Sequence, residues 1–158
     1  MYLTNSWYVA AWDHEVGKDL FPVKMLGEQI VLYRKTNGEV AALEDACPHR
    51  KLPLSMGRIK GDTVECGYHG LAFDQHGSCV RAPTNGVVPS RADIRAYRAE
   101  ARYGLVWLWM GEFDDADPST IFSVDHWDDP AWGTTIGDDM VVDCNYLSIV
   151  DNLLDPSH

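Results

Sequence analysis

Four residues that can bind a transition metal lie in two short stretches of the sequence, CPHR and CGYHG. Each stretch pairs one cysteine with one histidine: Cys47 with His49, and Cys66 with His69. Two thiolates and two imidazoles are a full ligand set for a tetrahedral zinc ion. They are also a full set for a 2Fe-2S cluster in which two histidines replace two cysteines on one iron. The pattern therefore predicts a metal centre of one of these two kinds.

The spacing of the ligands favours two metal atoms over one. One residue separates Cys47 from His49, whereas structural zinc sites usually place two to four residues between paired ligands. The short gap suits ligands that reach different atoms, with Cys47 and Cys66 on one iron and His49 and His69 on the other. Glycines beside the second pair allow the backbone to approach a cluster closely. We therefore expect the two loops to lie side by side at one tip of the domain.

A second set of polar side chains lies near the C-terminus, in the stretch DNLLDPSH. Asp151, Asp155 and His158 stand at i, i+4 and i+7, so on a helix they would share one face. Two carboxylates and an imidazole could serve acid-base chemistry there. Pro156 disfavours helical geometry at the residue before it, so we expect a helix to end or kink at that point.

Short strands joined by turns must position the first set of residues. The apolar runs QIVLYR and EVAAL flank an Asn-Gly pair, which predicts a β-hairpin. A second hairpin is expected around residues 74–78, and a third pair of strands from residues 94–101 and 103–110. The run 103–110 is so uniformly apolar that both of its faces should be covered. Residues 1–111 are therefore predicted to form a small antiparallel β domain.

The rest of the chain has a different character. Residues 112–133 are acidic, contain two prolines and show neither helical nor strand periodicity, which indicates a linker. Residues 134–158 are expected to begin a second domain. Within them we predict a strand over 137–146 and a helix with an apolar stripe over 144–155.

Composition excludes several classes of function. The 158 residues include 13 Lys plus Arg against 24 Asp plus Glu, a net charge of −11, which would repel nucleic acids and anionic membranes. No apolar run is long enough to span a bilayer, and the first residues lack the basic start of a signal peptide. We expect a cytoplasmic protein with no nucleic-acid or membrane partner. Four cysteines are few for a disulfide scaffold, so Cys79 and Cys144 are interpreted as core thiols.

The two loops resemble those of the Rieske proteins, in which C-x-H and C-x-x-H-G are separated by a gap of medium length. The Rieske proteins of cytochrome complexes carry an extra cysteine in each loop, and this sequence has none at those places, so it resembles the oxygenase or ferredoxin branch. The stretches WYVAAW, GLVWLWMG and DCNYLSIVDNLLDPSH extend the resemblance over the whole chain. It is most similar to Rieske non-heme iron oxygenases of the vanillate and methoxybenzoate O-demethylase group, which includes dicamba monooxygenase.

This resemblance implies a mainly β Rieske domain, an antiparallel β-sandwich with a cluster-binding subdomain, followed by the start of an α+β catalytic domain. Such oxygenases hold a mononuclear non-heme Fe(II) with two histidines and a carboxylate. By resemblance, His158 is the first iron ligand. Asp155 would join His158 by hydrogen bonds to the cluster ligand His69 of a neighbouring subunit in a homotrimer. The remaining ligands would follow His158, so we expect the sequence to be part of a longer protein.

The implied function is that of the terminal oxygenase of a Rieske-type monooxygenase system. An NAD(P)H-dependent reductase would supply the electrons, and the substrates would be O2 and a small aromatic compound. The aromatic compound would be hydroxylated or O-demethylated, as in a vanillate-like methoxybenzoate. Two alternatives stay open: a Rieske ferredoxin-like electron carrier with a C-terminal extension, and a zinc-stabilised interaction domain.

Overall fold

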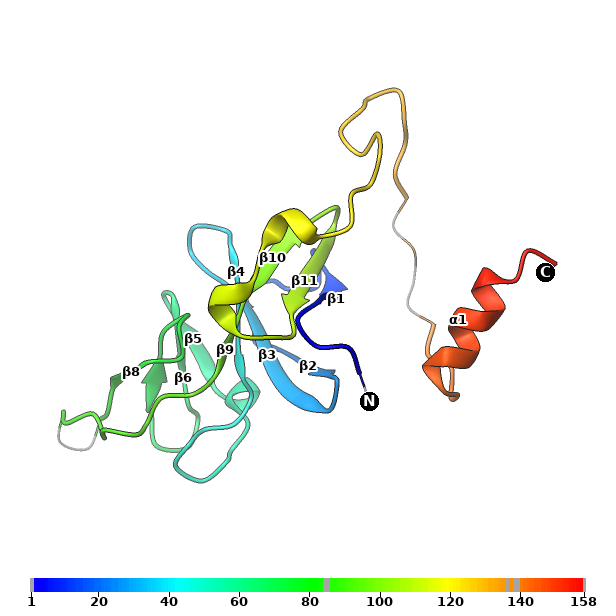
Figure 1. Ribbon diagram of the computed structural model, residues 1–158. Helices are drawn as coiled ribbons and strands as arrows, with labels where there is room; N and C mark the ends of the chain where they lie inside the picture. The colour runs from blue at the N-terminus through cyan, green and yellow to red at the C-terminus, as the bar shows by residue number, and fades with distance from the viewer. Residues whose placement is uncertain (1, 84–85, 136, 138–139, 158) are drawn as a thin grey trace. The chain divides into compact units, whose positions relative to one another are not determined.

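The computed structural model describes residues 2–83, 86–135, 137 and 140–157. The chain divides into two compact units, Met1–Val124 and Asp125–His158. All strands of the described residues lie in the first unit, and the second contains one helix (Figure 1). Within the described part of the chain, no helix is long and apolar enough to cross a membrane.

Three small antiparallel sheets build the first unit. The first sheet has the order β1-β11-β10, with strands Trp7–Trp12, Leu105–Trp109 and Ala99–Arg102. The second has the order β2-β3-β4-β9, with strands Phe21–Met25, Glu28–Arg34, Val40–Glu44 and Ala96–Tyr97. The third has the order β5-β6-β7-β8, with strands Arg58–Lys60, Thr63–Glu65, Ala72–Phe73 and Cys79–Arg81. This architecture confirms the expected mainly β, antiparallel fold class.

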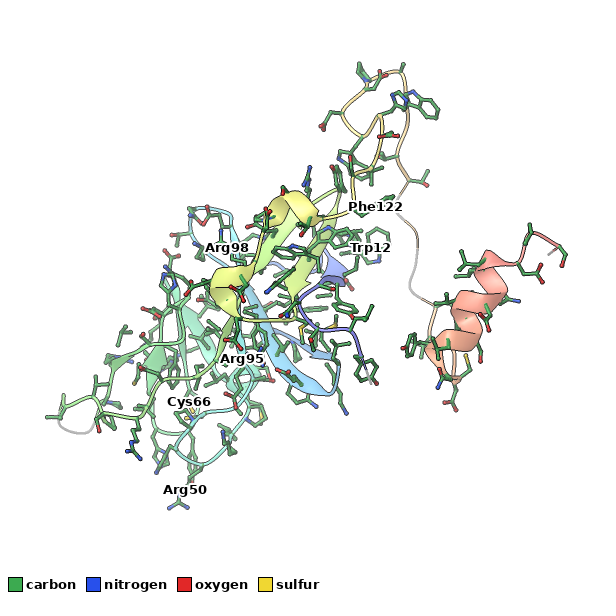
Figure 2. All side chains as sticks on the ribbon, viewed as in Figure 1. Trp12, Arg50, Cys66, Arg95, Arg98 and Phe122 are labelled. Atoms are coloured by element: carbon green, nitrogen blue, oxygen red, sulfur yellow. The ribbon has the colours of Figure 1, made fainter. Side chains whose placement is uncertain are left out.

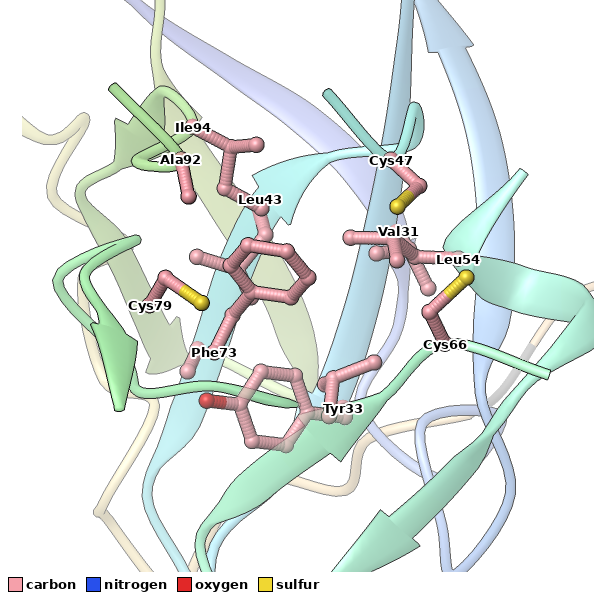
Figure 3. Close-up of a cluster of buried hydrophobic side chains, with 12 residues drawn as sticks. Val31, Tyr33, Leu43, Cys47, Leu54, Cys66, Phe73, Cys79, Ala92 and Ile94 are labelled. Carbon is pink, nitrogen blue, oxygen red and sulfur yellow. The ribbon is translucent and has the colours of Figure 1, made fainter. Parts of the chain in front are cut away.

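The second sheet lies between two hydrophobic cores. Along β3, Ile30 and Leu32 pack in one core with residues of the first sheet, while Val31 and Tyr33 pack in the other with residues of the third sheet (Figure 3). All four side chains have no exposed surface. Because successive side chains of a strand point to opposite faces, a continuous apolar run is required in a sheet that is covered on both sides. Burial of each such side chain contributes about 1.5–3 kcal/mol.

Two of the expected hairpins form where turn residues predict them. β3 and β4 are joined through Gly38, whose φ of 89° is in the region that favours glycine. β7 and β8 are joined by a turn in which Asp74 Oδ1 accepts hydrogen bonds from the amides of His76 (2.9 Å) and Ser78 (3.0 Å). These two hairpins are confirmed.

The third expected pair of strands is only partly correct. Residues 99–102 do pair with β11, but β9 pairs with β4 in the second sheet. The chain therefore passes from one sheet to the other at Arg98, whose carbonyl accepts a hydrogen bond from the amide of Trp109 at 2.9 Å. On β11, Val106 and Leu108 are fully buried and Leu105 and Trp107 are half-buried, so one face is covered more completely than the other.

The segment after β11 packs against the first unit. Two short 3-10 helices, η2 (Phe113–Asp115) and η3 (Pro118–Thr120), are followed by Ile121, which is 3% exposed. The indole Nε1 of Trp7 donates a hydrogen bond to the carbonyl of Asp117 at 2.9 Å. The first unit therefore continues to Val124, and the division of the whole protein at residues 111 and 133 stays a prediction.

In the second unit, the helix α1 spans Tyr146–Leu154. It begins at Asn145, whose side chain accepts a hydrogen bond from the amide of Leu147, and it ends at Asp155 before Pro156, as the sequence predicts. The expected strand over 137–146 is wrong for the described residues 137 and 140–145, which contain none. Residues 140–145 are exposed, and a strand needs a partner to satisfy its backbone groups.

Candidate metal centre

Two loops of matching backbone geometry hold the four predicted ligands. In the first, the amide of Cys47 donates to the carbonyl of Leu52 (2.8 Å), and the amide of Lys51 donates to the carbonyl of Cys47 (2.8 Å). In the second, the amide of Cys66 donates to the carbonyl of Leu71 (2.8 Å), and the amide of Gly70 donates to the carbonyl of Cys66 (3.0 Å). Each loop is therefore a tight turn that begins at its cysteine.

The residue four positions after each cysteine has a positive φ. Lys51 has φ 56° and Gly70 has φ 73°. A Cβ at Gly70 would also lie 3.3 Å from Cγ of Pro83, so glycine relieves both backbone and steric strain in the second loop. Lys51 adopts the same conformation at a cost of about 1–2 kcal/mol. The hydrogen bonds within each loop therefore hold these two residues in a backbone conformation that is unfavourable for a residue such as Lys51.

The two cysteine side chains are buried and point toward one another. Cys47 and Cys66 are each 3% exposed, and they share a hydrophobic core with Val31 and Leu54 (Figure 3). Burial raises the pKa of the Cys47 thiol; the amides of His49 and Arg50 lower it, and the neighbouring Cys66 thiol raises it. A metal must therefore displace a proton when it binds there, and the amide donors stabilise the resulting thiolate.

The two histidine side chains are exposed and face each other. Nδ1 of His49 lies 3.1 Å from Nδ1 of His69, and the ring centroids are 4.7 Å apart. Two nitrogen ligands, each about 2.1 Å from one metal, are about 3.0–3.4 Å apart for ligand–metal–ligand angles of about 90–110°. The spacing therefore fits two imidazoles that bind the same ion through Nδ1. The ring of Tyr68, 56% exposed, lies against His69 with a centroid distance of 3.9 Å.

The four ligands divide into two pairs, cysteines inside and histidines outside. Among the described residues, no three His, Cys, Asp or Glu side chains gather around one point where a single ion could bind. The division into one buried and one exposed pair fits a cluster of two irons, one bound by thiolates and one by imidazoles.

The surface around the histidines is largely apolar. His49 and His69 border a cavity of about 570 Å³ whose other walls are mostly proline and aliphatic side chains, with Arg91 as the charged residue. Arg50 extends away from the domain at the end that holds Cys66 (Figure 2). The imidazole edges are therefore the part of the centre that a partner can reach.

The remaining cysteines differ from each other. Cys79 is buried, and Phe73 separates it from the metal centre (Figure 3). Its position in the hydrophobic core confirms the interpretation as a core thiol, and burial raises the pKa of the thiol. The same interpretation of Cys144 is wrong, because Cys144 is exposed. It precedes α1 in the second unit, where the described side chains form no buried core.

At the C-terminal site, the structure describes Asp155 but not His158, which lies outside the described residues. Asp155 Oδ1 accepts hydrogen bonds from the amide (2.8 Å) and the hydroxyl (2.6 Å) of Ser157. Asp151 is exposed on α1. The bridging role of Asp155 and the iron-ligand role of His158 therefore stay predictions.

Sequence reasoning missed two carboxylates near the cysteines. Asp45 and Glu65 are the buried charged residues of the described chain, 7% and 1% exposed. Their position just before Cys47 and Cys66 was visible in the sequence, but an acidic residue at a strand end is usually solvated. Only the fold shows that both are inside.

The fold and the site define a β domain that presents two Cys-His loops to a two-metal cluster. The family model of the Rieske [2Fe-2S] domain matches residues 6–92, which include both loops, and the chain belongs to this family. The match supports the 2Fe-2S cluster, which the ligand spacing already favoured over zinc, and the chemistry of the four side chains fits it.

The chain is also similar to oxygenase subunits. It is 44% identical over 159 residues to the iron-sulfur subunit of a toluene-4-sulfonate monooxygenase system from Comamonas testosteroni, covering 100% of this chain and 46% of that protein. It is 37% identical over 158 residues to a vanillate O-demethylase oxygenase subunit from Pseudomonas sp. (strain HR199 / DSM 7063), covering 100% and 44%. The crystal structure of dicamba monooxygenase bound to dicamba superposes with a TM-score of 0.92 at 41% identity, covering 99% and 47%.

These similarities confirm the resemblance that the loops predicted. The chain spans about half the length of the curated relatives it matches. The match also continues through residues 93–158, which lie beyond the Rieske model.

Proposed function

We propose that the protein is the terminal oxygenase component of a Rieske-type monooxygenase system. The observation that carries this proposal is the match to oxygenase subunits along the whole chain, including the 66 residues after the Rieske model (158 − 92). A ferredoxin-like carrier would need only the Rieske part, so the similarity of residues 93–158 to oxygenases favours the oxygenase over the carrier.

In this proposal, Cys47 and Cys66 hold one iron of the cluster, and His49 and His69 hold the other through Nδ1. The opposed thiols and the 3.1 Å separation of the two Nδ1 atoms support this assignment. When bound, the 2Fe-2S cluster stores and passes single electrons, and a mononuclear iron supplies the activation of O2. The chain buries the thiolates, donates amide hydrogen bonds to the Cys47 sulfur, and leaves the imidazole edges exposed for electron exchange.

Asp155 and His158 would form the near half of the mononuclear iron site. His158 is proposed as the first ligand, and Asp155 as the residue that orients His158 and the His69 imidazole of a neighbouring subunit. Ser157 donates both of its hydrogen bonds to Oδ1 of Asp155, and a carboxylate can accept about four hydrogen bonds in all. A homotrimer in which neighbouring subunits share the site is part of this proposal.

The substrate is proposed to be a small aromatic compound that is hydroxylated or O-demethylated. The names of the relatives support this class: toluene-4-sulfonate, vanillate and dicamba are the compounds they refer to. An NAD(P)H-dependent reductase is the proposed electron donor, because the relatives are components of multicomponent systems. A cytoplasmic location belongs to the same proposal.

Spectroscopy of the full-length gene product tests the cluster. We expect visible absorbance from iron-sulfur charge transfer and, after reduction, the low-temperature EPR signal of a Rieske cluster with two irons per site. A colourless, EPR-silent protein that contains zinc would overturn the assignment.

Asp155→Asn tests the oxygenase function in the same full-length protein. We expect unchanged cluster absorbance and EPR but a loss of turnover of about 10–100-fold or more, because the amide cannot orient two imidazole N–H groups as the carboxylate does. Formaldehyde release from a methoxybenzoate measures turnover. Asp151→Asn, four residues earlier on α1, is the matched control and should retain parental turnover. Parental activity of Asp155→Asn would remove Asp155 from the electron path.

A further inference from the structure

A residue with a buried carboxylate comes just before each metal-binding loop in the sequence. Asp45 precedes Cys47 by two residues, and Glu65 precedes Cys66 by one. Among the described residues, these are the charged side chains that the fold buries. A buried carboxylate is costly unless hydrogen bonds or cations satisfy it, so the partners of each one indicate what it holds in place.

The partners of Glu65 are three cations of its own sheet. Arg58, Lys60 and Arg81 each form an ion pair with its carboxylate. Arg58, Glu65, Ala72 and Arg81 lie in one row across β5, β6, β7 and β8, and the small Ala72 leaves room for Arg81 to reach Glu65. This network ties the strands of the third sheet together.

The partner of Asp45 is a different segment of the chain. One oxygen of Asp45 accepts a hydrogen bond from the amide of Ser55 at 2.7 Å, and the other accepts from the Ser55 hydroxyl at 2.7 Å. The amide of Asp45 donates to the carbonyl of Gln29, a residue of β3, at 2.9 Å. Asp45 thereby closes the segment of residues 45–55, which contains Cys47 and His49, and fixes it to the second sheet.

Ser55 belongs to the 3-10 helix η1 (Leu54–Met56), which packs directly against the second loop. A Cβ at Gly57, the residue that ends η1, would lie 2.1 Å from the carbonyl oxygen of Glu65. A Cβ at Gly67 would lie 2.8 Å from the carbonyl oxygen of Met56. The backbones of η1 and of the start of the second loop are therefore as close as glycine permits.

We propose that Asp45 is a positioning residue that sets the separation of the two cluster-binding loops. It acts through Ser55 and η1, whose Leu54 is fully buried in the core that contains both Cys47 and Cys66. Loss of the carboxylate frees η1 from the first loop and lets the thiol and imidazole pairs move relative to each other. This inference rests on the proposed roles of the four ligands.

The test compares variants of the full-length holoenzyme by two measurements: the EPR g-values of the reduced cluster, and the rate at which a chelator bleaches the cluster. For Asp45→Ala we expect shifted or broadened g-values and bleaching about tenfold faster, since two charge-assisted hydrogen bonds no longer oppose opening of the loop. Asp45→Asn, which can accept one hydrogen bond from the Ser55 amide, should fall between Asp45→Ala and the parent.

A matched control exists on the same domain. Asp62 likewise accepts hydrogen bonds from the amide (2.7 Å) and the hydroxyl (2.8 Å) of a single residue, Thr36, although both bonds go to the same carboxylate oxygen. Asp62 lies at the end of β6 that is remote from Cys66. Asp62→Asn should therefore keep the parental g-values and bleaching rate.

The outcomes separate this proposal from the proposed function. Parental g-values and bleaching rate in Asp45→Ala would overturn the positioning role while the parent still shows a Rieske signal. A parent without that signal would instead overturn the ligand assignment. If Asp45→Ala does not fold, Ser55→Ala decides: it removes only the hydroxyl bond, and faster bleaching than Asp62→Asn supports the proposal, whereas a parental rate overturns it.

Discussion

At the residue scale, the site places its sulfur ligands inside the protein and its nitrogen ligands at the surface. Cys47 and Cys66 are buried, whereas His49 and His69 are exposed. The arrangement gives the two irons of a cluster different surroundings, because charge near water is screened more strongly than charge in a core. Electron exchange is thereby directed to the imidazole side.

Two buried cysteines allow a paired test of ligand identity. Cys66→Ala removes a thiolate, so we expect the purified protein to lose about nine-tenths or more of its cluster absorbance, since a 2Fe-2S cluster needs all four ligands. Cys79→Ala removes a sulfur of similar burial. It should lower the free energy of unfolding by about 1–2 kcal/mol because of the small cavity.

The Cys79→Ala protein should nevertheless retain the cluster absorbance per mole. Iron and labile sulfide analysis of both variants checks the result. Equal cluster content in the two would contradict the assignment of Cys66.

The four ligands could be predicted from the sequence because their types and short spacings are local features. The contact of Asp45 with Ser55 could not, since it depends on where the chain returns ten residues later. For Cys144, the sequence predicts a buried thiol, but the thiol is exposed. Cysteine is usually buried in proteins, but its neighbours in the folded chain decide, and those of Cys144 leave it exposed.

At the scale of elements, a short 3-10 helix connects the two loops. η1 has three residues, and Gly57 follows it. The backbone of Gly57 lies so close to Glu65 that an added Cβ would be 2.1 Å from the Glu65 carbonyl oxygen. The position of η1 makes it the element through which a change in one loop reaches the other.

Gly57→Ala should therefore be severe for so small a change. The added methyl group meets a backbone oxygen, which cannot rotate away, so we expect the free energy of unfolding to fall by about 3 kcal/mol and the cluster to be lost faster. Gly17→Ala is the control, because nothing lies within 4 Å of its Cβ position. Chemical denaturation followed by circular dichroism measures both. Equal stabilities would show that η1 can move away from Glu65.

Local signals also explain which elements could be predicted. The Asn-Gly turn specifies the β3–β4 hairpin whatever surrounds it. The change of sheet at Arg98 has no such signal, because the choice of β4 or β11 as a partner depends on residues far away in the sequence. The absent strand over 140–145 is a related case, since a β-rich run forms a strand only beside a partner.

At the scale of the whole molecule, the first unit contains everything that its cores and its metal centre need. The buried residues of both cores and all four proposed ligands lie between Ala11 and Met110. The second unit presents apolar side chains of α1, such as Leu147 and Leu153, that are more than half exposed. The stability of the second unit therefore depends on further contacts more than the stability of the first unit does.

A fragment of residues 1–124 should consequently fold and bind the cluster. We expect it to show the Rieske EPR signal of the longer protein and a thermal midpoint within a few degrees of the first-unit transition, because no core contact is removed. Calorimetry and EPR of the fragment check this. Loss of the signal from a folded fragment would mean that residues 125–158 support the loops.

The double-sided burial of β3 also has a consequence for biosynthesis. Ile30, Val31, Leu32 and Tyr33 form an uncharged, β-prone segment, the composition that promotes aggregation when it is exposed. One of its faces is covered by β11, which leaves the ribosome long after β3. Nascent or prematurely terminated chains therefore display this segment until β11 arrives. Slower synthesis at low temperature and added chaperone capacity are therefore expected to raise the soluble yield.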